Sequence, residues 1–275
     1  SRLGPDHPDV ALSLCNLAQL YLDTGRFEKA EPLLQRSLKI RESKLGPDDA
    51  SVAESLNNLS ALHASLGQDE KALPLLRRSL EINEARYGPE SPDVAHGLHN
   101  LAVLERCLGR YEQAEILYRR SLKICEAWLG AAHPEVVTSL NGLADLYVAM
   151  GKYEEAEPLL QRSLRIRESK LGADHPDVAS NLQDMAMLRW QLGRNGEAEQ
   201  LLRASLKIRE SKLGPDHPEV AANLANLGVL AAARAAWPES VEFFSRERRA
   251  SRRLLARVLP GLCEAEQLRL IEGSD

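Results

Sequence analysis

Apolar residues recur at steps of three and four along the start of the chain, which is the spacing of one face of an α-helix. The residues on this stripe are Val10, Leu14, Leu17, Ala18 and Tyr21. Pro8 suits the first helical position, because the N–H that proline lacks has no helical partner there, and Gly25 is typical of a helix end. The pattern predicts a first helix of about four turns.

A second helix is predicted from about Phe27 to Ser43, followed by the loop 45–48 with its Gly-Pro pair. The residues expected to face inward are Ala30, Leu33, Leu34, Ser37, Leu38 and Ile40. The small Ala30 lets two helices approach closely. The short connection between the two helices favours an antiparallel pair.

This pattern returns every 42 residues, so that equivalent positions form columns. One column holds Val10, Val52, Val94, Val136, Val178 and Val220. Units begin near residues 3, 45, 87, 129, 171 and 213. A fixed long period predicts an all-α stack of six helix pairs, since one pair alone leaves an apolar face exposed to water.

One column directly precedes each first helix and is predicted to cap it. It holds His7, Asp49, Ser91, His133, His175 and His217. Asp and Ser are strong N-caps, and the acidic residues that mostly follow suit the positive end of the helix dipole. The four histidines are alternatively metal ligands, but stacking spaces them about 10 Å apart, whereas ligands of one ion lie about 2 Å from it.

The composition and charge of the chain limit the classes of function that it can have. A net charge of −5, from 35 basic and 40 acidic residues, gives no case for nucleic acid as a partner. No apolar run approaches the roughly 20 residues of a membrane span. Four widely spaced cysteines fit a reducing compartment, and we expect a cytoplasmic protein with no membrane partner.

The best instance of the pattern NLA-x-LY…G-[RK]-[FY]-x-x-AE-x-LL-x-RSL…LG-x-DHP-x-VA is the segment from Asn16-Leu17-Ala18 through Val52, in which Asp49-Ala50 replace His-Pro. It resembles the tetratricopeptide repeat of the 42-residue kind found in kinesin light chains and nephrocystin-like proteins. The resemblance covers residues 3 to about 250. It implies a right-handed α-solenoid, with six repeats over 1–250 and a C-terminal capping segment over 251–275, that binds a protein or peptide on its concave surface without catalysis or cofactors.

In that family geometry the first helix of each pair lines the concave face. Polar columns that vary between units are free to serve a ligand, whereas fixed columns are explained by packing. The candidate ligand-binding residues are Asn57, Asn58, His96, His99, Asn100, Arg106, Asn141, Asp145, Asp184 and Trp190.

These side chains predict a groove rich in amides with a cationic and aromatic centre. Amides donate and accept, so they hold a peptide backbone of any sequence. Arg106 and the histidines are expected to supply charge, and Trp190 to anchor an apolar or cationic side chain. The alternative for the column of Asn58 and Asn100 is structural, with each amide bonding across to the next repeat.

Catalytic and metal motifs are absent from the sequence: there is no HExxH, GxSxG or phosphate-binding glycine loop. His96 and His99, three residues apart on one helix, lack a clear third metal ligand. Cys107 near His99 is interpreted as a thiol at the groove edge rather than as half of a catalytic pair. We expect no enzyme activity and no bound metal.

The sixth unit departs from the pattern, which is typical of a terminal cap. Its second helix is predicted from Trp237 to about Val258, with a further short helix over 264–271. The arginine-rich run 246–257 is interpreted as a solvated face, with an acidic partner as the alternative. Residues 252–268 are similar to the junction where bacterial repeat proteins precede a CHAT domain, a caspase-like peptidase.

That similarity implies a second hypothesis, in which the repeats are the regulatory or substrate-recruiting arm of a larger enzyme, a caspase-like peptidase or a signalling ATPase. A third hypothesis is end-to-end self-association through the open face near residues 3–10.

Overall fold

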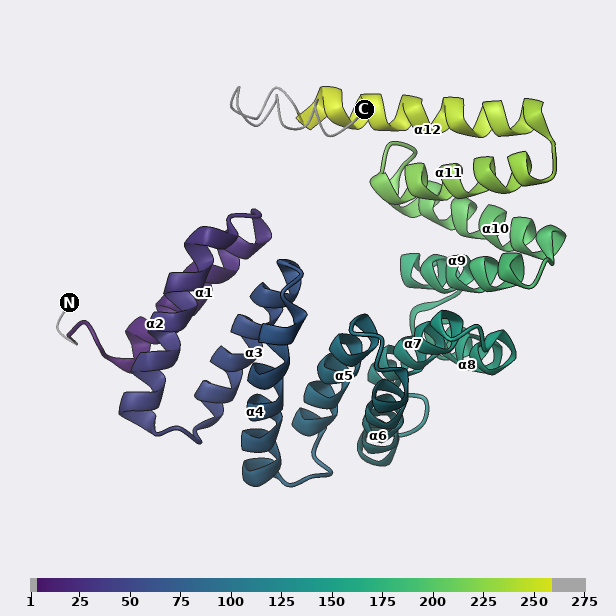
Figure 1. The fold of residues 1–275 in the computed structure, drawn as a ribbon. Helices are drawn as coiled ribbons and strands as arrows, with labels where there is room; N and C mark the ends of the chain where they lie inside the picture. Colours follow the sequence, from purple (N-terminus) through teal and green to yellow (C-terminus); the bar gives the residue numbers. More distant parts are fainter. Residues whose placement is uncertain (1–3, 259–275) are drawn as a thin grey trace. The chain divides into compact units, whose positions relative to one another are not determined.

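The computed structural model describes residues 4–258, and these form twelve α-helices without a strand. The helices are α1 (Pro8–Asp23), α2 (Phe27–Leu45), α3 (Ala50–Ser65), α4 (Asp69–Tyr87), α5 (Pro92–Cys107), α6 (Tyr111–Leu129), α7 (Pro134–Ala149), α8 (Tyr153–Leu171), α9 (Pro176–Gln191), α10 (Asn195–Leu213), α11 (Pro218–Ala233) and α12 (Trp237–Val258). The all-α class and the six helix pairs are confirmed (Figure 1). The short helix expected over 264–271 lies outside the described residues.

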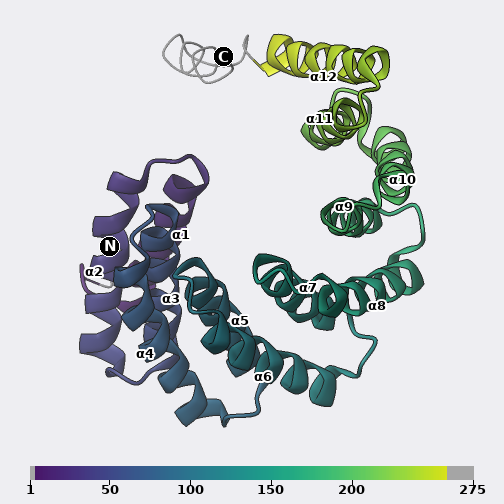
Figure 2. The same ribbon diagram turned by 45° about the vertical axis from the view of Figure 1, so that its right-hand side comes forward.

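The chain divides into two compact units, unit 1 over Ser1–Met150 and unit 2 over Gly151–Asp275. In unit 1, α1 packs on α2, α3 on α4 and α5 on α6, and each second helix then contacts the first helix of the next pair. In unit 2 the same order joins α9 to α10 and α11 to α12 (Figure 2). Each unit is therefore a stack built from contacts between sequence neighbours.

The predicted capping column is confirmed. Each first helix is preceded by an extended residue whose side chain accepts a backbone N–H of the first turn, as when His7 Nδ1 accepts from Asp9 N. The histidines thus act as neutral acceptors in place of Asp or Ser. The second helices run two residues further than predicted, since α2 ends at Leu45 and not at Ser43.

The core is aliphatic. Leu62, Leu104, Leu146, Leu188 and Leu230 occupy one column and are each at most 4% exposed. Their counterpart in the first repeat, Leu20, is 57% exposed, because no second helix of an earlier repeat in the described residues covers α1. Burial here comes from the neighbouring pair and not from the pair itself.

A buried serine on the second helix joins the two helices of most pairs. Ser37 donates to the carbonyl of Ala11 at 2.9 Å, and Ser79 donates to that of Ala53 at 2.8 Å. Ser121 and Ser205 make the equivalent bonds. The bond gives the buried hydroxyl a hydrogen-bond partner. Serine is also small enough for the two helices to pack closely.

An arginine ladder joins successive pairs. Arg78 on α4 donates to Glu42 on α2 at 2.7 Å, and Arg120 on α6 donates to Glu84 on α4 at the same distance. In unit 2, Arg246 on α12 pairs with Glu210 on α10 in the same way. These pairs are partly exposed, so they contribute modestly to stability and mainly set the register between repeats.

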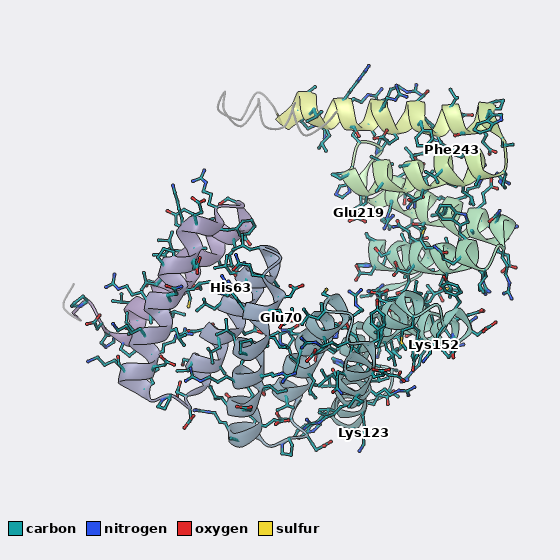
Figure 3. The ribbon with its side chains drawn as sticks, in the orientation of Figure 1. His63, Glu70, Lys123, Lys152, Glu219 and Phe243 are labelled. Carbon is teal, nitrogen blue, oxygen red and sulfur yellow. The ribbon has the colours of Figure 1, made fainter. Side chains whose placement is uncertain are left out.

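The last helix packs as a second helix should, with Phe243 buried against α11 (Figure 3). Its turn differs from the other five. Gly25, Gly67, Gly109, Gly151 and Gly193 hold φ between +68° and +73° at this turn. Ala235 holds φ +59° in their place, a left-handed conformation that costs an L-residue roughly 1 kcal/mol or more.

We expect Ala235→Gly to stabilise the protein by up to about 1 kcal/mol, because strain relief exceeds the entropy that glycine gains in the unfolded chain. The matched control is Gly193→Ala, where an added Cβ meets open space and only the backbone is affected. That variant should lose about 1 kcal/mol. Thermal unfolding followed by circular dichroism measures both, and a lower melting temperature for Ala235→Gly would contradict the strain argument.

Candidate functional site

The first helices α3, α5 and α7 of unit 1 carry the polar positions that distinguish its repeats. α5 contacts α7 directly, so side chains from neighbouring first helices meet on one face. Asn57, Asn58, His99, Asn100, Arg106 and Asn141 are partly buried there, and His96 and Asp145 are more exposed. Eight of the ten candidate residues therefore belong to unit 1.

Between α3 and α5 lies a cavity of about 360 Å³. Its walls include Ala61, Ala64, Leu76 and Val103, with Cys107 also lining it. The cavity exists because the residues at two columns are small in this repeat. The column of Ala64 holds the larger Leu22, Arg106, Val148 and Trp190 in the repeats of α1, α5, α7 and α9, and a second alanine, Ala232, in that of α11.

Two predicted amides line this cavity together. Asn100 Nδ2 on α5 donates to Asn57 Oδ1 on α3 at 3.2 Å. Asn100 thus bonds to the preceding repeat, whereas the structural alternative for its column expects a bond to the next one. The bond uses one group of each amide, so Asn57 keeps its NH₂ and Asn100 keeps its carbonyl for other partners.

A second cluster lies between α5 and α7, around a buried tyrosine on α6. The rings of His99 and Tyr118 meet edge to face, with centroids 5.3 Å apart. A Cβ on Gly142 would come within 2.5 Å of Tyr118 Cε1, which explains the glycine in a column that is mostly asparagine. Burial raises the pKa of the Tyr118 hydroxyl, whereas the nearby Arg106 lowers it.

Three polar atoms of this cluster are buried and have no hydrogen-bond partner among residues 4–258: His99 Nδ1, Arg106 Nε and Asn141 Oδ1. Arg106 also acts electrostatically on the carboxylate of Asp145. Buried polar groups in native proteins are nearly always hydrogen-bonded, and an unmade bond costs about 1–3 kcal/mol. Within the described residues, α5 and α7 thus leave a buried donor and a buried acceptor open on adjacent first helices.

The expectation that His99 supplies positive charge is wrong. Burial, and to a smaller extent the charge of His96, lower the pKa of His99 from 6.5 to about 4. His99 is therefore neutral near pH 7, because desolvation penalises the imidazolium. Arg106 is the cation of this cluster, and His99 contributes a ring and one polar nitrogen.

The remaining candidates, Asp184 and Trp190, lie on α9 in unit 2. Trp190 is partly buried and packs against the core cluster of α9, α10 and α11. Asp184 acts electrostatically on Arg209 of α10. The contacts given above for both residues lie within unit 2.

Sequence reasoning missed three contributors: Tyr118, the paired alanines Ala61 and Ala64, and Gly142. The signal was present in the last two, because each departs from larger or polar residues in its column. Tyr118 gave no such signal, since a tyrosine on the second helix is interpreted as a residue of the core. Within residues 4–258, no group of three or more His, Cys, Asp or Glu side chains is arranged to hold a metal ion. No helix in that range is long and apolar enough to cross a membrane.

Stacked helical hairpins with a variable face on their first helices define a helical-repeat protein. The tetratricopeptide repeat model matches residues 1–43, 51–127, 93–169, 135–211 and 178–253. The chain belongs to the tetratricopeptide repeat family. A search among curated proteins gave no match.

Solved structures show the same fold. BtubC (BKLC) from P. vanneervenii is 21% identical with a TM-score of 0.70, over 83% of this chain and 92% of that one. A putative kinesin light chain of Podosopora anserina is 26% identical with a TM-score of 0.65, over 74% and 97%. A Rap protein solved in complex with Competence and Sporulation Factor is 18% identical with a TM-score of 0.62, over 90% and 65%. The likeness to kinesin light chain repeats inferred from the sequence is confirmed.

The low pKa of His99 predicts a pH-dependent loss of stability. The unfolded chain protonates this imidazole near pH 6.5, whereas the folded protein resists protonation until about pH 4. The free energy of unfolding therefore has its full value above about pH 6.5. It decreases by about 3 kcal/mol in total as the pH falls towards 4.

Urea unfolding of the wild type and of His99→Gln at pH values between 4 and 8 tests this. As the pH falls from 8 to 4, the free energy of unfolding should decrease less for His99→Gln than for the wild type. The control His96→Gln removes only the smaller of the two causes, so its pH dependence should stay close to that of the wild type and well above that of His99→Gln. Parallel pH profiles for the wild type and His99→Gln would contradict the desolvation of His99.

Proposed function

We propose that this protein is a non-catalytic scaffold that binds a protein or peptide segment on the α3–α5–α7 face of unit 1. One observation carries the proposal: unpaired buried polar atoms lie on the same face as an apolar cavity. Water-exposed surfaces of stable domains rarely combine the two without a ligand to satisfy them. We place this role in the cytoplasm, in keeping with four widely spaced cysteines.

The polar atoms suit a peptide main chain. Arg106 Nε–H offers a donor and Asn141 Oδ1 an acceptor, which complement the C=O and N–H of a ligand backbone. The open groups of Asn57 and Asn100 extend this pattern to the next repeat. Such contacts hold an extended segment without reading its sequence.

The apolar cavity between α3 and α5 supplies selectivity. Its volume of about 360 Å³ and its alanine walls suit one bulky apolar side chain. Burial of such a side chain is worth about 1.5–3 kcal/mol. The helices are already stacked, so binding requires little ordering of the protein.

The comparisons support a binding role at the level of the fold. Tetratricopeptide repeats match throughout the chain, and a structurally similar Rap protein was solved in complex with Competence and Sporulation Factor. Cys107 is exposed and lines the apolar cavity, consistent with the interpretation of it as a groove-edge thiol.

Peptides selected on the wild-type protein from a random display library provide the test. We expect Ala64→Leu to weaken their binding about tenfold or more, because leucine fills the cavity as Leu22 does in the first repeat. Arg106→Gln should weaken binding to a similar degree. Fluorescence anisotropy with the labelled peptides measures both.

Arg252→Gln on α12 is the control for these variants and should bind as the wild type does. Matching thermal unfolding curves establish that the variants are folded. Selected peptides that bind both groove variants unchanged would place the binding surface elsewhere and refute the proposal.

A further inference from the structure

Four arginines form one stripe along α12 in unit 2. They are Arg246, Arg249, Arg253 and Arg257, which follow one another at steps of three or four residues and therefore share a face of the helix. Arg249, Arg253 and Arg257 are exposed, and Arg246 is partly buried. We call these four residues the arginine stripe.

Two of the four arginines have no counterpart in the other repeats. The column of Arg253 holds only serine or alanine there: Ser43, Ala85, Ala127, Ser169 and Ser211. The column of Arg257 holds only proline or alanine: Pro47, Pro89, Ala131, Ala173 and Pro215. The stripe is thus a property of the sixth repeat and not of the repeat pattern.

The length of α12 explains how Arg257 joins the stripe. The other second helices end before a glycine with positive φ, such as Gly46 after α2 and Gly214 after α10. Ala256 replaces that glycine in the sixth repeat, and α12 continues to Val258. The extension adds one more guanidinium group to the same helix face.

Carboxylates of the described residues neutralise the stripe only in part. Arg246 Nη2 donates to Glu210 Oε1 at 2.7 Å. Arg253 and Arg257 share the single carboxylate of Asp216, at the longer distances of 3.5 and 3.3 Å. The two guanidinium groups are 66% and 72% exposed, so these pairs are weak and can be exchanged for a better partner.

Arg249 lies between these pairs. Its Nε donates to the Ser245 carbonyl at 3.2 Å, and no carboxylate within residues 4–258 pairs with it. Four guanidinium groups thus face two carboxylates, which leaves an excess of positive charge on this surface.

A cavity of about 210 Å³ lies beside the stripe. Leu224 of α11 and Ala250 of α12 supply apolar surface to its wall, whereas Arg246, Arg249 and Arg253 line it with charge. The cavity therefore offers an apolar side chain a place next to exposed cations.

The cavity occupies a place that the other repeats fill with isoleucine. The column of Ala250 holds Ile40, Ile82, Ile124, Ile166 and Ile208. In the second repeat, Ile82 belongs to one core cluster with Leu56, and these two residues are the equivalents of Ala250 and Leu224. The shorter alanine leaves that space open.

We propose that the arginine stripe binds an acidic segment of a partner protein, whose carboxylates pair with Arg249, Arg253 and Arg257 and whose aliphatic side chain enters the cavity at Ala250. Arginine suits this role because its planar fork donates two parallel hydrogen bonds to one carboxylate. The surface belongs to unit 2 and shares no residue with the proposed groove of unit 1.

An acidic polypeptide fits this surface better than a nucleic acid does. Glu210 and Asp216 stand among the arginines and would repel a continuous row of phosphates. No aromatic side chain of the described residues lines the cavity, so none is available there to stack on a base. A polypeptide can space its carboxylates and place an aliphatic residue between them.

The probe is a fluorescein-labelled peptide with one isoleucine between two runs of three glutamates, measured by fluorescence anisotropy. We expect the protein to bind it at least about tenfold more tightly than the same peptide with glutamines in place of glutamates. Added salt should weaken the binding, because the charges are exposed. Equal affinity for the two peptides would overturn the proposal.

The double variant Arg249→Gln/Arg253→Gln should lose about tenfold or more in affinity for the acidic peptide. The matched control is Arg165→Gln, which changes the exposed arginine at the column of Arg249 on α8 and should bind as the wild type does. Circular dichroism establishes that both variants are folded. A folded double variant that binds the acidic peptide as the wild type does would reject the stripe.

The variant Ala250→Ile tests the cavity separately from the charge. Isoleucine fills the space as it does in the other five repeats, so the midpoint of thermal unfolding should rise. Affinity for the peptide should fall to that of a peptide with alanine in place of its isoleucine. A folded Ala250→Ile protein that still prefers the isoleucine peptide would overturn the proposal.

Other occupants of the stripe give distinguishable results, and each would overturn the assignment to an acidic partner. An oligothymidine that binds as tightly as the acidic peptide would indicate a nucleic acid. Peptide binding that emerges only after Glu264, Glu266 and Glu272 are changed to glutamine would assign the stripe to the chain's own segment. Self-association that is lost in the double variant would assign it to a second copy.

Discussion

A pair of short antiparallel helices cannot bury its apolar surface without a neighbour, and every other feature of this protein follows from that constraint. Leu20 is 57% exposed in the first repeat, whereas Leu62 in the next is fully buried at the same position. The second helix of each repeat is thus part of the core of the next. Serine bonds within pairs and the Arg–Glu ladder between pairs keep the spacing regular, so that equivalent residues occupy equivalent places.

Regular spacing makes each repeat a reference for the others. A residue common to a column is explained once by packing, and a departure from it has a local physical consequence. Ala64 lines an open cavity between α3 and α5, whereas its column holds Leu22 and Trp190 in other repeats. Gly142 lacks the side chain that Tyr118 would exclude.

The environment of each residue also changes its chemistry. His7 directly precedes the first helix of its repeat, whereas His99 lies in the middle of α5, and their roles differ. His7 caps the helix by accepting a backbone N–H, whereas His99 packs against the Tyr118 ring and is held neutral by burial. The Arg106 cluster therefore presents one strong cation beside a neutral ring, which is a more directional surface than a group of like charges.

The sequence by itself determined the helices, their pairing and their order, because local periodicity, caps and a 42-residue repeat leave one arrangement for the chain to adopt. It also identified the face of α3, α5 and α7 that varies, and it missed the ends of the second helices by two residues.

Only the tertiary structure decided which of those residues act together. Three features depend on distances between repeats: the Asn57–Asn100 bond, the tyrosine that excludes a side chain at Gly142, and the low pKa of His99. Such distances are set by packing across a neighbouring pair, where the sequence specifies which residues are apolar but not how closely their polar neighbours approach.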